Sequence, residues 1–484
     1  MASKAKTDLV RGLGLLTATS VVVGSMIGSG IFKKPGLMAS QLGSPRLLML
    51  VWVLAGLMTL CGSLTNAEIG GIFPATGGQY YFFNKIYGKF FAFIFGWAIF
   101  AVVQTSSIGS IAYIFGESAG HLVNLPHFSP EIEKAWVIHL PYIGNIFPLA
   151  DIGTKLVAIG LMAFLTVVNV LGLLLGGSVQ NALTLLKLIA IGAIILFAVF
   201  TPMGSLEHFS ETLASTPKTS FAIFAAFIGA MSGAFWAYDG WNNVTYIAGE
   251  IKNPQKNLPR SLFLGTVTVI TVYVLINLAY IYVLPIEIMA KSRLVASDMA
   301  RLSMGAVGER FVIITILLST FGSCNGSLMS SARVYFAMAR EKMFFSPIGK
   351  VSPRHHTPAN SLILQFFWSS LLVLSGTFDM LTDMLIFVTW IFYGMGALGV
   401  FILRHKMPDI ERPYKVWGYP WVPGIYIASA FIFLIQTLYN DITNYISGAA
   451  PLINSLFGIV LVLLGTPLYF YFTKKTPSEG ERRS

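Results

Sequence analysis

Residues 24–32 read Gly-Ser-Met-Ile-Gly-Ser-Gly-Ile-Phe and lie in the middle of the first apolar segment of the chain, at about 13–41. Residues 233–242 read Gly-Ala-Phe-Trp-Ala-Tyr-Asp-Gly-Trp-Asn and interrupt another apolar segment, at about 221–248, in the same way. Glycine costs about 1 kcal/mol relative to alanine inside a helix, so three glycines within seven residues favour an unwound stretch. Unwound backbone at membrane depth persists only where it is buried or lines a cavity. The two interruptions therefore predict a pair of broken helices around a central site.

The composition shows that the apolar segments belong in a membrane. Of the 484 residues, 55% are hydrophobic and 11% are charged, whereas a soluble protein carries roughly 25% charged residues. A chain with so few charges cannot cover a water-facing surface, so its solvent must be lipid. The formal net charge of +11 then reflects membrane topology and does not indicate a nucleic-acid partner.

The chain is predicted to be an all-α membrane protein with about twelve transmembrane helices. The interrupted segments are the first and the sixth, and this spacing of five fits two inverted five-helix repeats, at about 13–200 and 221–403. Two further helices, at about 421–473, follow the repeats. The expected spans are approximately 13–41, 46–67, 90–118, 153–174, 180–200, 221–248, 261–284, 311–336, 360–377, 381–403, 421–440 and 453–473.

The distribution of basic residues orients the spans. An even number of spans puts both termini on one side of the membrane, and 21 of the 32 lysine and arginine residues lie on that side. Eight lie on the opposite side, and Lys33, Lys34 and Lys187 lie within spans. Cytoplasmic loops carry the excess of lysine and arginine. We therefore expect a multi-pass protein of the cell membrane (plasma or inner) with short tails and both termini in the cytoplasm.

The two interruptions supply complementary groups for a free α-amino acid. The half-helix after the first one presents unpaired N–H groups at Gly28, Ser29 and Gly30 and the positive end of its dipole, which suit a carboxylate. The half-helix that ends at the other presents free carbonyl groups near residues 235–237, which suit an ammonium group. Gly24 and Gly28 alone would also fit a G-x-x-x-G face for helix packing, but the matching interruption in the sixth span favours the broken helix.

Other kinds of site are not indicated. The two cysteines, Cys61 and Cys324, lie inside apolar stretches, so neither a disulfide framework nor a covalent link to a partner subunit is expected. The sequence has no zinc-like spacing of Cys and His and no G-x-x-x-x-G-K-[ST] phosphate loop. It also has no cluster of nucleophile, base and orienting residue typical of an enzyme, and no repeated filter loops or charged rings typical of a channel. We expect no metal, no cofactor and no enzymatic activity.

Five short motifs are distributed over nearly the whole chain. They are Gly28-Ser29-Gly30-Ile31-Phe32, Ala237-Tyr238-Asp239-Gly240-Trp241-Asn242, Gly249-Glu250-Ile251-Lys252-Asn253-Pro254, Asn325-Gly326-Ser327 and Pro408-Asp409-Ile410-Glu411-Arg412-Pro413-Tyr414-Lys415. In this order they resemble the amino acid–polyamine–organocation superfamily, and most closely its L-type amino acid transporter family with its bacterial relatives. The resemblance implies an inverted-repeat fold that works by alternating access.

The resemblance also implies that Trp236 is an aromatic gate over the bound substrate. Many relatives have phenylalanine there, and the larger tryptophan would shrink the pocket in favour of small or medium neutral substrates. The alternative role for this ring is simple packing in the core. Asp239 and Gly240 are expected to form the hinge of the sixth span together with Trp236, with Asp239 hydrogen-bonded locally.

Asn325 and Tyr393 are polar residues of the eighth and tenth spans. Each is expected either to line the pocket or to form a hydrogen bond between helices. The full set of expected substrate-binding residues is Ile27, Gly28, Ser29, Gly30, Phe235, Trp236, Ala237, Tyr238, Asn325 and Tyr393.

Lys187 carries the only charge of the fifth predicted span. An ammonium inside a span costs about 2.5 kcal/mol or more, so it should face the bundle. In the resembled family, a lysine at this place occupies the region where sodium-coupled relatives bind sodium. Its ammonium would bridge the backbone near Gly24 or Ser25 to hydroxyls of the eighth span such as Ser319 or Thr320. The alternatives are a side chain that reaches the cytoplasmic edge and a proton carrier.

Two further pairs of charged residues flank the broken helices. Lys33 and Lys34 follow the first interruption and are expected to line the outer vestibule. Glu250 and Lys252 follow the sixth span and are expected to belong to the cytoplasmic gate, because contact with bulk lipid would be too costly for them.

These features predict a sodium-independent secondary transporter of neutral L-amino acids that works by alternating access and is an exchanger. A proton-coupled amino acid or polyamine symporter is the alternative. The expected partners are small-molecule amino acids and membrane lipid. Some members of the resembled family pair with a single-span glycoprotein through an outer-loop cysteine. This sequence has no such cysteine, so no covalent heavy-chain partner is expected.

Overall fold

The computed structural model describes residues 12–172 and 177–474, and the described chain is almost entirely helical. The one pair of strands within these residues is a short antiparallel hairpin, β1 (Ile138–Leu140) with β2 (Gly144–Ile146). The predicted all-α class is therefore confirmed. The short tails, with the basic residues Lys4, Lys6, Arg11 and those after residue 474, lie outside the described residues.

Within the described residues, eleven helical spans are long and apolar enough to cross a membrane. The remaining predicted span, the ninth at about 360–377, corresponds to α15 (Ala359–Ser375), which is apolar but shorter. The eleven are α1 (Leu15–Met26) with α2 (Gly30–Leu42), α3 (Pro45–Ile72), α5 (Lys89–Ala98) with α6 (Gln104–Gly120), α8 (Ile152–Val170), α9 (Gly177–Phe200), α10 (Ser220–Tyr238), α12 (Pro254–Val283), α14 (Val295–Arg340), α16 (Phe378–Lys406), α17 (Trp421–Ile446) and α18 (Asn454–Leu463) with α19 (Gly465–Lys474).

Shorter elements connect the spans. A π-helical turn, η1 (Ile99–Val103), joins α5 to α6, as such turns often do inside longer helices. The others are α4 (Gln79–Tyr87), α7 (Pro130–Ala135), α11 (Asn243–Tyr246), α13 (Ile286–Lys291) and the 3-10 turns η2 (Glu207–Ser210), η3 (Ala248–Glu250) and η4 (Ser346–Gly349).

Two spans differ from their predicted bounds. The eighth span, predicted at 311–336, is the longer helix α14, which is interrupted at Gly305 by a backbone conformation of φ 63° and ψ −154°. The segment before residue 311 carries charged residues and lacks the hydropathy of a span, so the apolar pattern could not reveal it. The sixth span, predicted at 221–248, ends as a helix at Tyr238 and continues as the separate turn α11.

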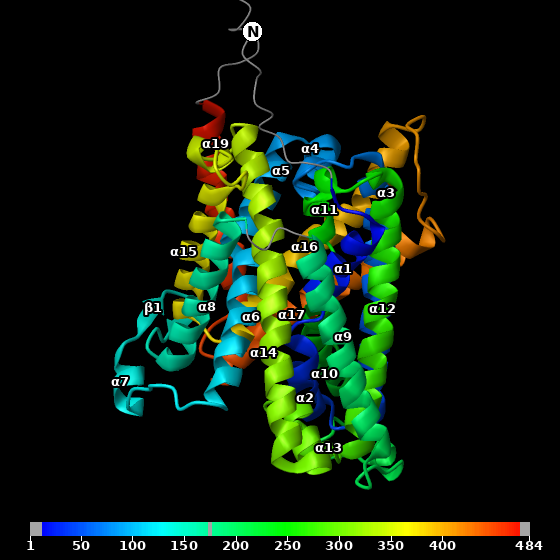
Figure 1. Ribbon diagram of the computed structural model, residues 1–484, viewed down its shortest axis with the longest axis vertical. Coiled ribbons are helices and arrows are strands. Elements are labelled where there is room, and N and C mark those ends of the chain that lie inside the picture. Colours follow the sequence, from blue (N-terminus) through cyan, green and yellow to red (C-terminus); the bar gives the residue numbers. More distant parts are fainter. Residues whose placement is uncertain (1–11, 173–176, 475–484) are drawn as a thin grey trace, which may run out of the picture.

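The bundle has two distinct ends (Figure 1). The short helix α4 lies at one end together with α19, and we call this the α4 end. The helices α7 and α13 lie at the other, which we call the α13 end. The helix α1 lies nearer the α4 end and its continuation α2 nearer the α13 end, so the break between them falls at mid-depth.

The spans that hold the core are the broken first span, α6 and α14. In the most apolar stretch of the first span, 78% of the residues are buried inside the protein. The corresponding share is 72% in α14 and only 17% in the last span. The first span packs against α9, α10, α12 and α14, so both halves of the broken helix are enclosed by protein. Burial on all sides is the condition under which unwound backbone is tolerated at membrane depth.

Candidate functional site

The break in the first span leaves backbone donors unpaired at the start of α2. The helix α1 ends at Met26, and the Gly28 N–H closes a tight turn onto the Met26 carbonyl at 2.8 Å. Among the described residues the Ser29 N–H has no backbone acceptor, and the N–H groups at the start of α2 have no partner within their own helix until Phe32, whose N–H donates to the Ser29 carbonyl at 3.1 Å. The carboxylate-binding donors expected at residues 28–30 therefore reduce to Ser29 and Gly30, because the turn uses the Gly28 N–H.

The break in the sixth span exposes carbonyls at the end of α10. The chain leaves the helix at Asp239 in an extended conformation and turns at Gly240, whose φ of +98° suits glycine. The Asp239 N–H donates a hydrogen bond to the Trp236 carbonyl at 3.1 Å. The Tyr273 hydroxyl of α12 lies 2.9 Å from the Ala237 carbonyl and 2.8 Å from the Met26 carbonyl of the other break. A hydroxyl has one proton, so it donates to one of these two carbonyls at a time.

The two breaks fit against each other through glycine. A Cβ added at Gly30 would lie 2.7 Å from the Cα of Ala237, and a Cβ added at Gly240 would lie 3.0 Å from the Ser25 carbonyl. Each glycine thus permits the close approach of the opposite break. The ends of the two half-helices come together for this reason, one offering N–H groups and the other carbonyl groups.

A small cavity lies where the breaks meet. Its volume is about 20 Å³, which is enough for one or two water molecules and too little for an amino acid. The Oγ of Ser25 in its wall is buried and has no hydrogen-bond partner among the described residues. The cavity is therefore closed around a polar centre. Its lining residues are Ser25, Met26, Gly28, Gly30, Ser107, Ile111, Trp236, Ala237, Asp239, Gly240 and Ser327.

The Lys187 ammonium of α9 fastens the first break to α14. Its Nζ donates to the carbonyls of Gly24 at 2.8 Å and Ile27 at 2.9 Å, and to the Ser323 hydroxyl at 2.7 Å. The side chain is buried, and three acceptors satisfy all three donors of the ammonium. Ser319 adds a hydroxyl contact to the Ile27 carbonyl at 3.2 Å. An ammonium buried in this way holds α1, α9 and α14 together.

The α13 end is closed over the cavity by two lysines of α2. Lys33 pairs with Glu117 of α6 at 2.5 Å, and Lys34 pairs with Asp379 of α16 at 2.9 Å. Beside these pairs the Trp236 ring packs edge-on against a ring of α16, Phe378, at a centroid distance of 4.9 Å. The contacts join α2 and α10 to α6 and α16, so the two sides of the bundle meet above the breaks.

The α4 end is closed by ion pairs as well. Glu250 pairs with Arg333 of α14 at 3.0 Å, and its carbonyl accepts the N–H groups of Gly12 and Leu13. Near this end the Tyr80 hydroxyl donates to Glu341 at 3.0 Å. Burial, and then the Glu341 carboxylate, raises the pKa of Tyr80 above its ordinary value. The hydroxyl therefore stays protonated as a donor.

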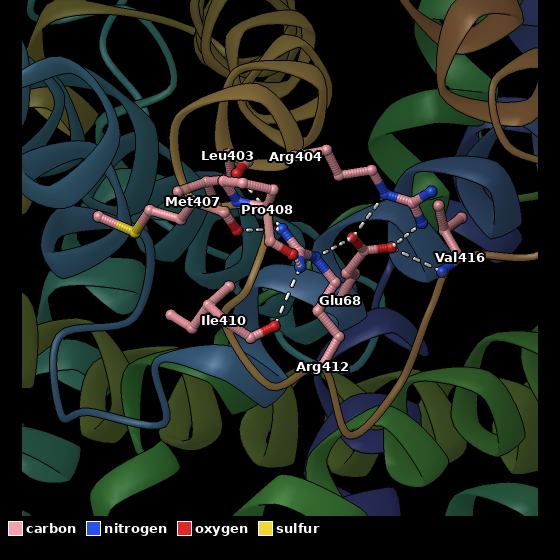
Figure 2. Close-up of polar contacts among 8 residues, drawn as sticks. All are labelled: Glu68, Leu403, Arg404, Met407, Pro408, Ile410, Arg412 and Val416. Atoms are coloured by element: carbon pink, nitrogen blue, oxygen red, sulfur yellow. Dashed lines mark hydrogen bonds and ion pairs between the residues drawn. The ribbon is translucent and has the colours of Figure 1, made fainter.

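A second carboxylate at the α4 end, Glu68 of α3, is the centre of a larger cluster (Figure 2). It accepts two hydrogen bonds from Arg404, at 3.0 and 2.7 Å, and the Val416 N–H at 2.7 Å. The guanidinium of Arg412 lies 3.5 Å away. Glu68 thereby ties α3 to the end of α16 and to the loop that follows, which contains the motif at residues 408–415.

Comparison with known proteins agrees with this geometry. A family model described as amino acid permease matches residues 13–465. The chain belongs to the amino acid permease family. The serine/threonine exchanger SteT of Bacillus subtilis is 32% identical over 473 residues, which cover 97% of this chain and 98% of that protein. The large neutral amino acids transporter small subunit 2 of Oryctolagus cuniculus is 31% identical over 467 residues, and the b(0,+)-type amino acid transporter 1 of Mus musculus 29% over 468.

These matches confirm the resemblance seen in the motifs and make this permease a multi-pass amino acid transporter. The rabbit and mouse relatives are covered over 80% and 88% of their own length, and this permease over 96% in both cases. The similarity thus extends over the whole bundle and is not confined to the broken helices.

About half of the predicted site residues line the central cavity. Those that do are Gly28, Gly30, Trp236, Ala237, Asp239 and Gly240. Ser29 is fully buried beside it, and Ile27 turns its carbonyl to Lys187. Phe235 instead packs on the Trp390 ring at 4.0 Å, and the Tyr238 hydroxyl donates to the Trp52 carbonyl at 3.1 Å.

Three predicted residues of the permease have partners that can be compared with the expectation, and only Lys187 has a different hydroxyl partner than expected. Lys187 reaches Gly24 but takes the hydroxyl of Ser323, while Thr320 donates to the Ile316 carbonyl of its own helix at 2.7 Å. Asn325 accepts from Asn169 of α8 at 2.7 Å, which is the interhelical role. The Asp239 carboxylate accepts the N–H of the adjacent Gly240, as the predicted local hydrogen bond, and also the Tyr393 hydroxyl of α16 at 2.7 Å.

Sequence reasoning missed several residues around the cavity. Ser107 and Ile111 line it from α6, and Tyr273 bridges the breaks from α12. A signal existed for α6, since Gln104-Thr105-Ser106-Ser107 puts four polar residues in an apolar span. Tyr273 has no comparable signal, because a single tyrosine in a span is equally compatible with packing.

Proposed function

We propose that this permease carries neutral L-amino acids across the membrane by alternating access, as an exchanger that does not use sodium. The observation that carries the proposal is the meeting of the two breaks at one cavity. The start of α2 offers the N–H groups of Ser29 and Gly30 for a carboxylate, and the end of α10 offers carbonyl groups for an ammonium. A free amino acid carries both charges a few ångströms apart.

Closure at both ends supports alternating access. The ion pairs of Lys33 and Lys34 close the α13 end, and those of Glu68 and Glu250 close the α4 end. With a cavity of about 20 Å³ between them, an amino acid reaches the site only if one end opens. We propose that the two ends open in turn, with Trp236 moving as the aromatic ring in the wall of the central cavity.

Sodium independence is argued from Lys187. A sodium ion at the first break would need oxygen ligands such as the carbonyls of Gly24 and Ile27 and the hydroxyl of Ser323. The Lys187 ammonium already occupies these three oxygens at 2.7–2.9 Å. A second cation there would face both the loss of its ligands and the repulsion of a like charge.

The choice of small neutral substrates and of exchange rests on two kinds of support. The indole of Trp236 fills part of the cavity wall and would leave little space for a large side chain. Among the similar proteins is one named as a serine/threonine exchanger. We therefore take L-threonine as the substrate to test first.

The topology is proposed as follows. Two inverted repeats, at about 13–200 and 221–403, place the breaks at equivalent positions, with the last two spans appended. The α4 end faces the cytoplasm, where both termini lie, because the basic residues of the loops gather on that side. Cys324 is buried and Cys61 half-buried, and neither lies in a loop of the α13 end. We therefore propose that no heavy chain is attached covalently.

A proton-coupled symporter of amino acids or polyamines is the second candidate. One observation favours it: within the described part of the chain, Lys187 is a buried ammonium whose three partners are all uncharged. Because no carboxylate pairs with Lys187, loss of its proton would not leave a buried negative charge without a partner. A proton could thus leave and return during the cycle.

The deciding experiment is uptake of labelled L-threonine into proteoliposomes. The vesicles are preloaded with unlabelled threonine or left empty, and the sodium and pH gradients are varied separately. Uptake that requires internal threonine and ignores both gradients is expected for the exchanger. Uptake into empty vesicles driven by an inward proton gradient would replace the exchanger by the symporter, and a requirement for sodium would contradict both.

A further inference from the structure

A second polar cavity lies at the α13 end, between α2, α10, α16 and α17. Its volume is about 310 Å³, which is within the range of pockets that bind small molecules and far above that of the central cavity. Leu37 and Asn444 on its rim are exposed, so the cavity opens to the surface. Its charged and amide-bearing residues are Lys34, Gln41, Asp383, Asn440, Asp441 and Asn444.

The two carboxylates of this cavity lie within membrane spans. Asp383 is the sixth residue of α16, and Asp441 is the sixth residue from the end of α17. Ionisable residues in spans are costly, face the bundle interior or a water-filled cavity, and mark the pathways of substrates and ions. Two of them at one cavity, together with three amide side chains, indicate an aqueous binding space and not a groove filled by lipid tails.

The cavity holds opposite charges whose hydrogen bonds are incomplete. Lys34 is 1% exposed, and its Nζ donates to Asp379 at 2.9 Å and Thr382 at 3.1 Å. An ammonium has three donors, so one N–H of Lys34 remains. Asp383 is hydrogen-bonded by Ser232 but has no cation within ion-pairing distance among the described residues, and Asp441 accepts the Ser455 N–H at 2.8 Å. Asp383 on one side of the cavity thus lacks a positively charged partner, and Lys34 on the other side lacks a third hydrogen-bond acceptor.

We propose that this cavity is a second binding site for a free amino acid, in which Asp383 binds the α-ammonium group and Lys34 the α-carboxylate. A zwitterion meets both needs at once, whereas a metal ion would satisfy the carboxylates and leave Lys34 unchanged. The amides of Asn440 and Asn444 remain for a neutral polar side chain. The assignment rests on the proposed function, because it takes the transported amino acid as the ligand.

The site has a consequence for the closed α13 end. Lys34 is the residue that pairs with Asp379 across this end, and its Nζ lies 6.0 Å from the ring of Trp236. A carboxylate bound at Lys34 competes with Asp379 for the same ammonium. The incoming amino acid therefore loosens the contact that bars its own way to the central cavity.

The test counts molecules of labelled L-threonine bound per purified full-length chain, by equilibrium dialysis. Two are expected for the wild type. Asp383→Asn is expected to bind one, at the central cavity, because it removes the charge that holds the ammonium. Gly30→Ala puts a methyl group 2.7 Å from the Cα of Ala237, which forces the two breaks of the central site out of position, and it is expected to bind one, at the second site. Combining the two substitutions should abolish binding.

Controls keep the count interpretable. Glu207 is an exposed carboxylate of η2, and Glu207→Gln makes the same chemical change away from the cavity, so it should retain two molecules. Asp441→Asn alters the α17 side of the cavity and leaves α16 unchanged. It should weaken binding of the threonine at the second site alone. Thermal unfolding of each variant identifies any that fail to fold.

The outcomes separate this site from the proposed function. A wild-type chain that exchanges threonine but binds one molecule, unaffected by Asp383→Asn, overturns the second site and keeps the transporter. Loss of both molecules in a folded Asp383→Asn chain also overturns it, because the central site should remain. A wild-type chain that neither binds nor exchanges threonine contradicts both proposals.

Discussion

The two broken helices are held by different chemistry. At the first break, the carbonyls of Gly24 and Ile27 receive the charged Lys187 ammonium from α9. At the second break, the Ala237 carbonyl receives the neutral hydroxyl of Tyr273 from α12. Hydrogen bonds from an ionised donor are roughly twice as strong as neutral ones. The carbonyls of the first break are therefore held more strongly than the Ala237 carbonyl of the second, whose charged contact is made instead by a side chain, the Asp239 carboxylate with the Tyr393 hydroxyl.

The largest effect is expected where the breaks touch, because neither is formed without the other. Gly30→Ala puts a methyl group 2.7 Å from the Cα of Ala237, so the breaks must separate. Threonine exchange should fall about a hundredfold, near the upper end of the 1–3 kcal/mol typical of overpacking. The measurement is the initial exchange rate per folded chain in proteoliposomes.

Gly192 of α9 is the matched control for this change. A Cβ at Gly192 meets no atom within 4 Å, so Gly192→Ala should exchange threonine like the wild type. Equal exchange by Gly30→Ala and Gly192→Ala would mean that the close contact of the two breaks is unimportant for transport.

The next largest effect should come from the charged anchor of the first break. Lys187→Met removes the charged donor to two backbone carbonyls and to Ser323, and leaves those carbonyls only the neutral hydroxyls of Ser319 and Ser323. Hydrogen bonds to charged groups are worth about 1.5–3 kcal/mol each. Part of this is offset because a buried charge is also removed. We expect at least a tenfold loss of exchange, with unequal changes in apparent affinity on the two sides of the membrane.

Lys155 of α8 offers a matched control, since it is equally buried and also donates to three carbonyls, those of Phe147, Pro148 and Leu374. It lies away from both breaks. Lys155→Met should lower thermal stability and leave exchange per folded chain within about twofold of the wild type, a change too small to reach 1 kcal/mol. If both lysine variants lose exchange equally, Lys187 serves the fold and not the break.

A smaller effect is expected at the neutral contact between the breaks. Tyr273→Phe keeps the ring but removes the hydroxyl near the Met26 and Ala237 carbonyls. A neutral hydrogen bond contributes about 0.5–1.5 kcal/mol, so KM for threonine should rise about three- to tenfold while the maximal rate changes little. Tyr280, seven residues further along α12, is as deeply buried and its hydroxyl has no partner among the described residues. Tyr280→Phe should leave KM unchanged, and a matching rise there would remove the special role of Tyr273.

The smallest effect distinguishes two hydroxyls of α14. Ser323→Ala removes one of three acceptors of Lys187 and a hydroxyl contact to the Gly24 and Ile27 carbonyls, but both carbonyls keep their bond to Lys187. Exchange should therefore fall about two- to threefold, or about 0.5 kcal/mol. Thr320→Ala removes a hydroxyl that bonds within its own helix and should have no measurable effect. A larger loss of exchange in Thr320→Ala than in Ser323→Ala would show that Thr320, and not Ser323, makes the contact to the first break.

Much of this arrangement could be predicted from local sequence. The positions of the breaks were evident because glycines and an aspartate interrupt apolar spans, and glycine acts on the helix in which it stands. The charge of Lys187 inside its span predicted only that it faces the bundle, and the family resemblance implied a backbone partner near Gly24 or Ser25, of which Gly24 is one. Asp383, by contrast, gives no signal in the sequence, since an acid near the start of a span is indistinguishable from one at the membrane surface.

The partners of these residues could not be predicted in the same way. Thr320 and Ser323 are one turn apart on α14, and the helix register against α1 decides which of them meets Lys187. Asp239 and Tyr393 are 154 residues apart, and no local pattern links them. Such pairs depend on how helices pack, which involves the shapes of many side chains at once.

The sequence by itself determined that this chain is an all-helical membrane protein, where its first and sixth spans break, and that the breaks carry complementary backbone groups. These follow from hydropathy and glycine content, which act over a few residues. The tertiary structure alone decided that Gly30 and Gly240 each rest on the opposite break, that both ends are closed by ion pairs, and that a second charged cavity opens beside Lys34. Those features arise between helices, and their geometry is fixed only when the whole bundle has packed.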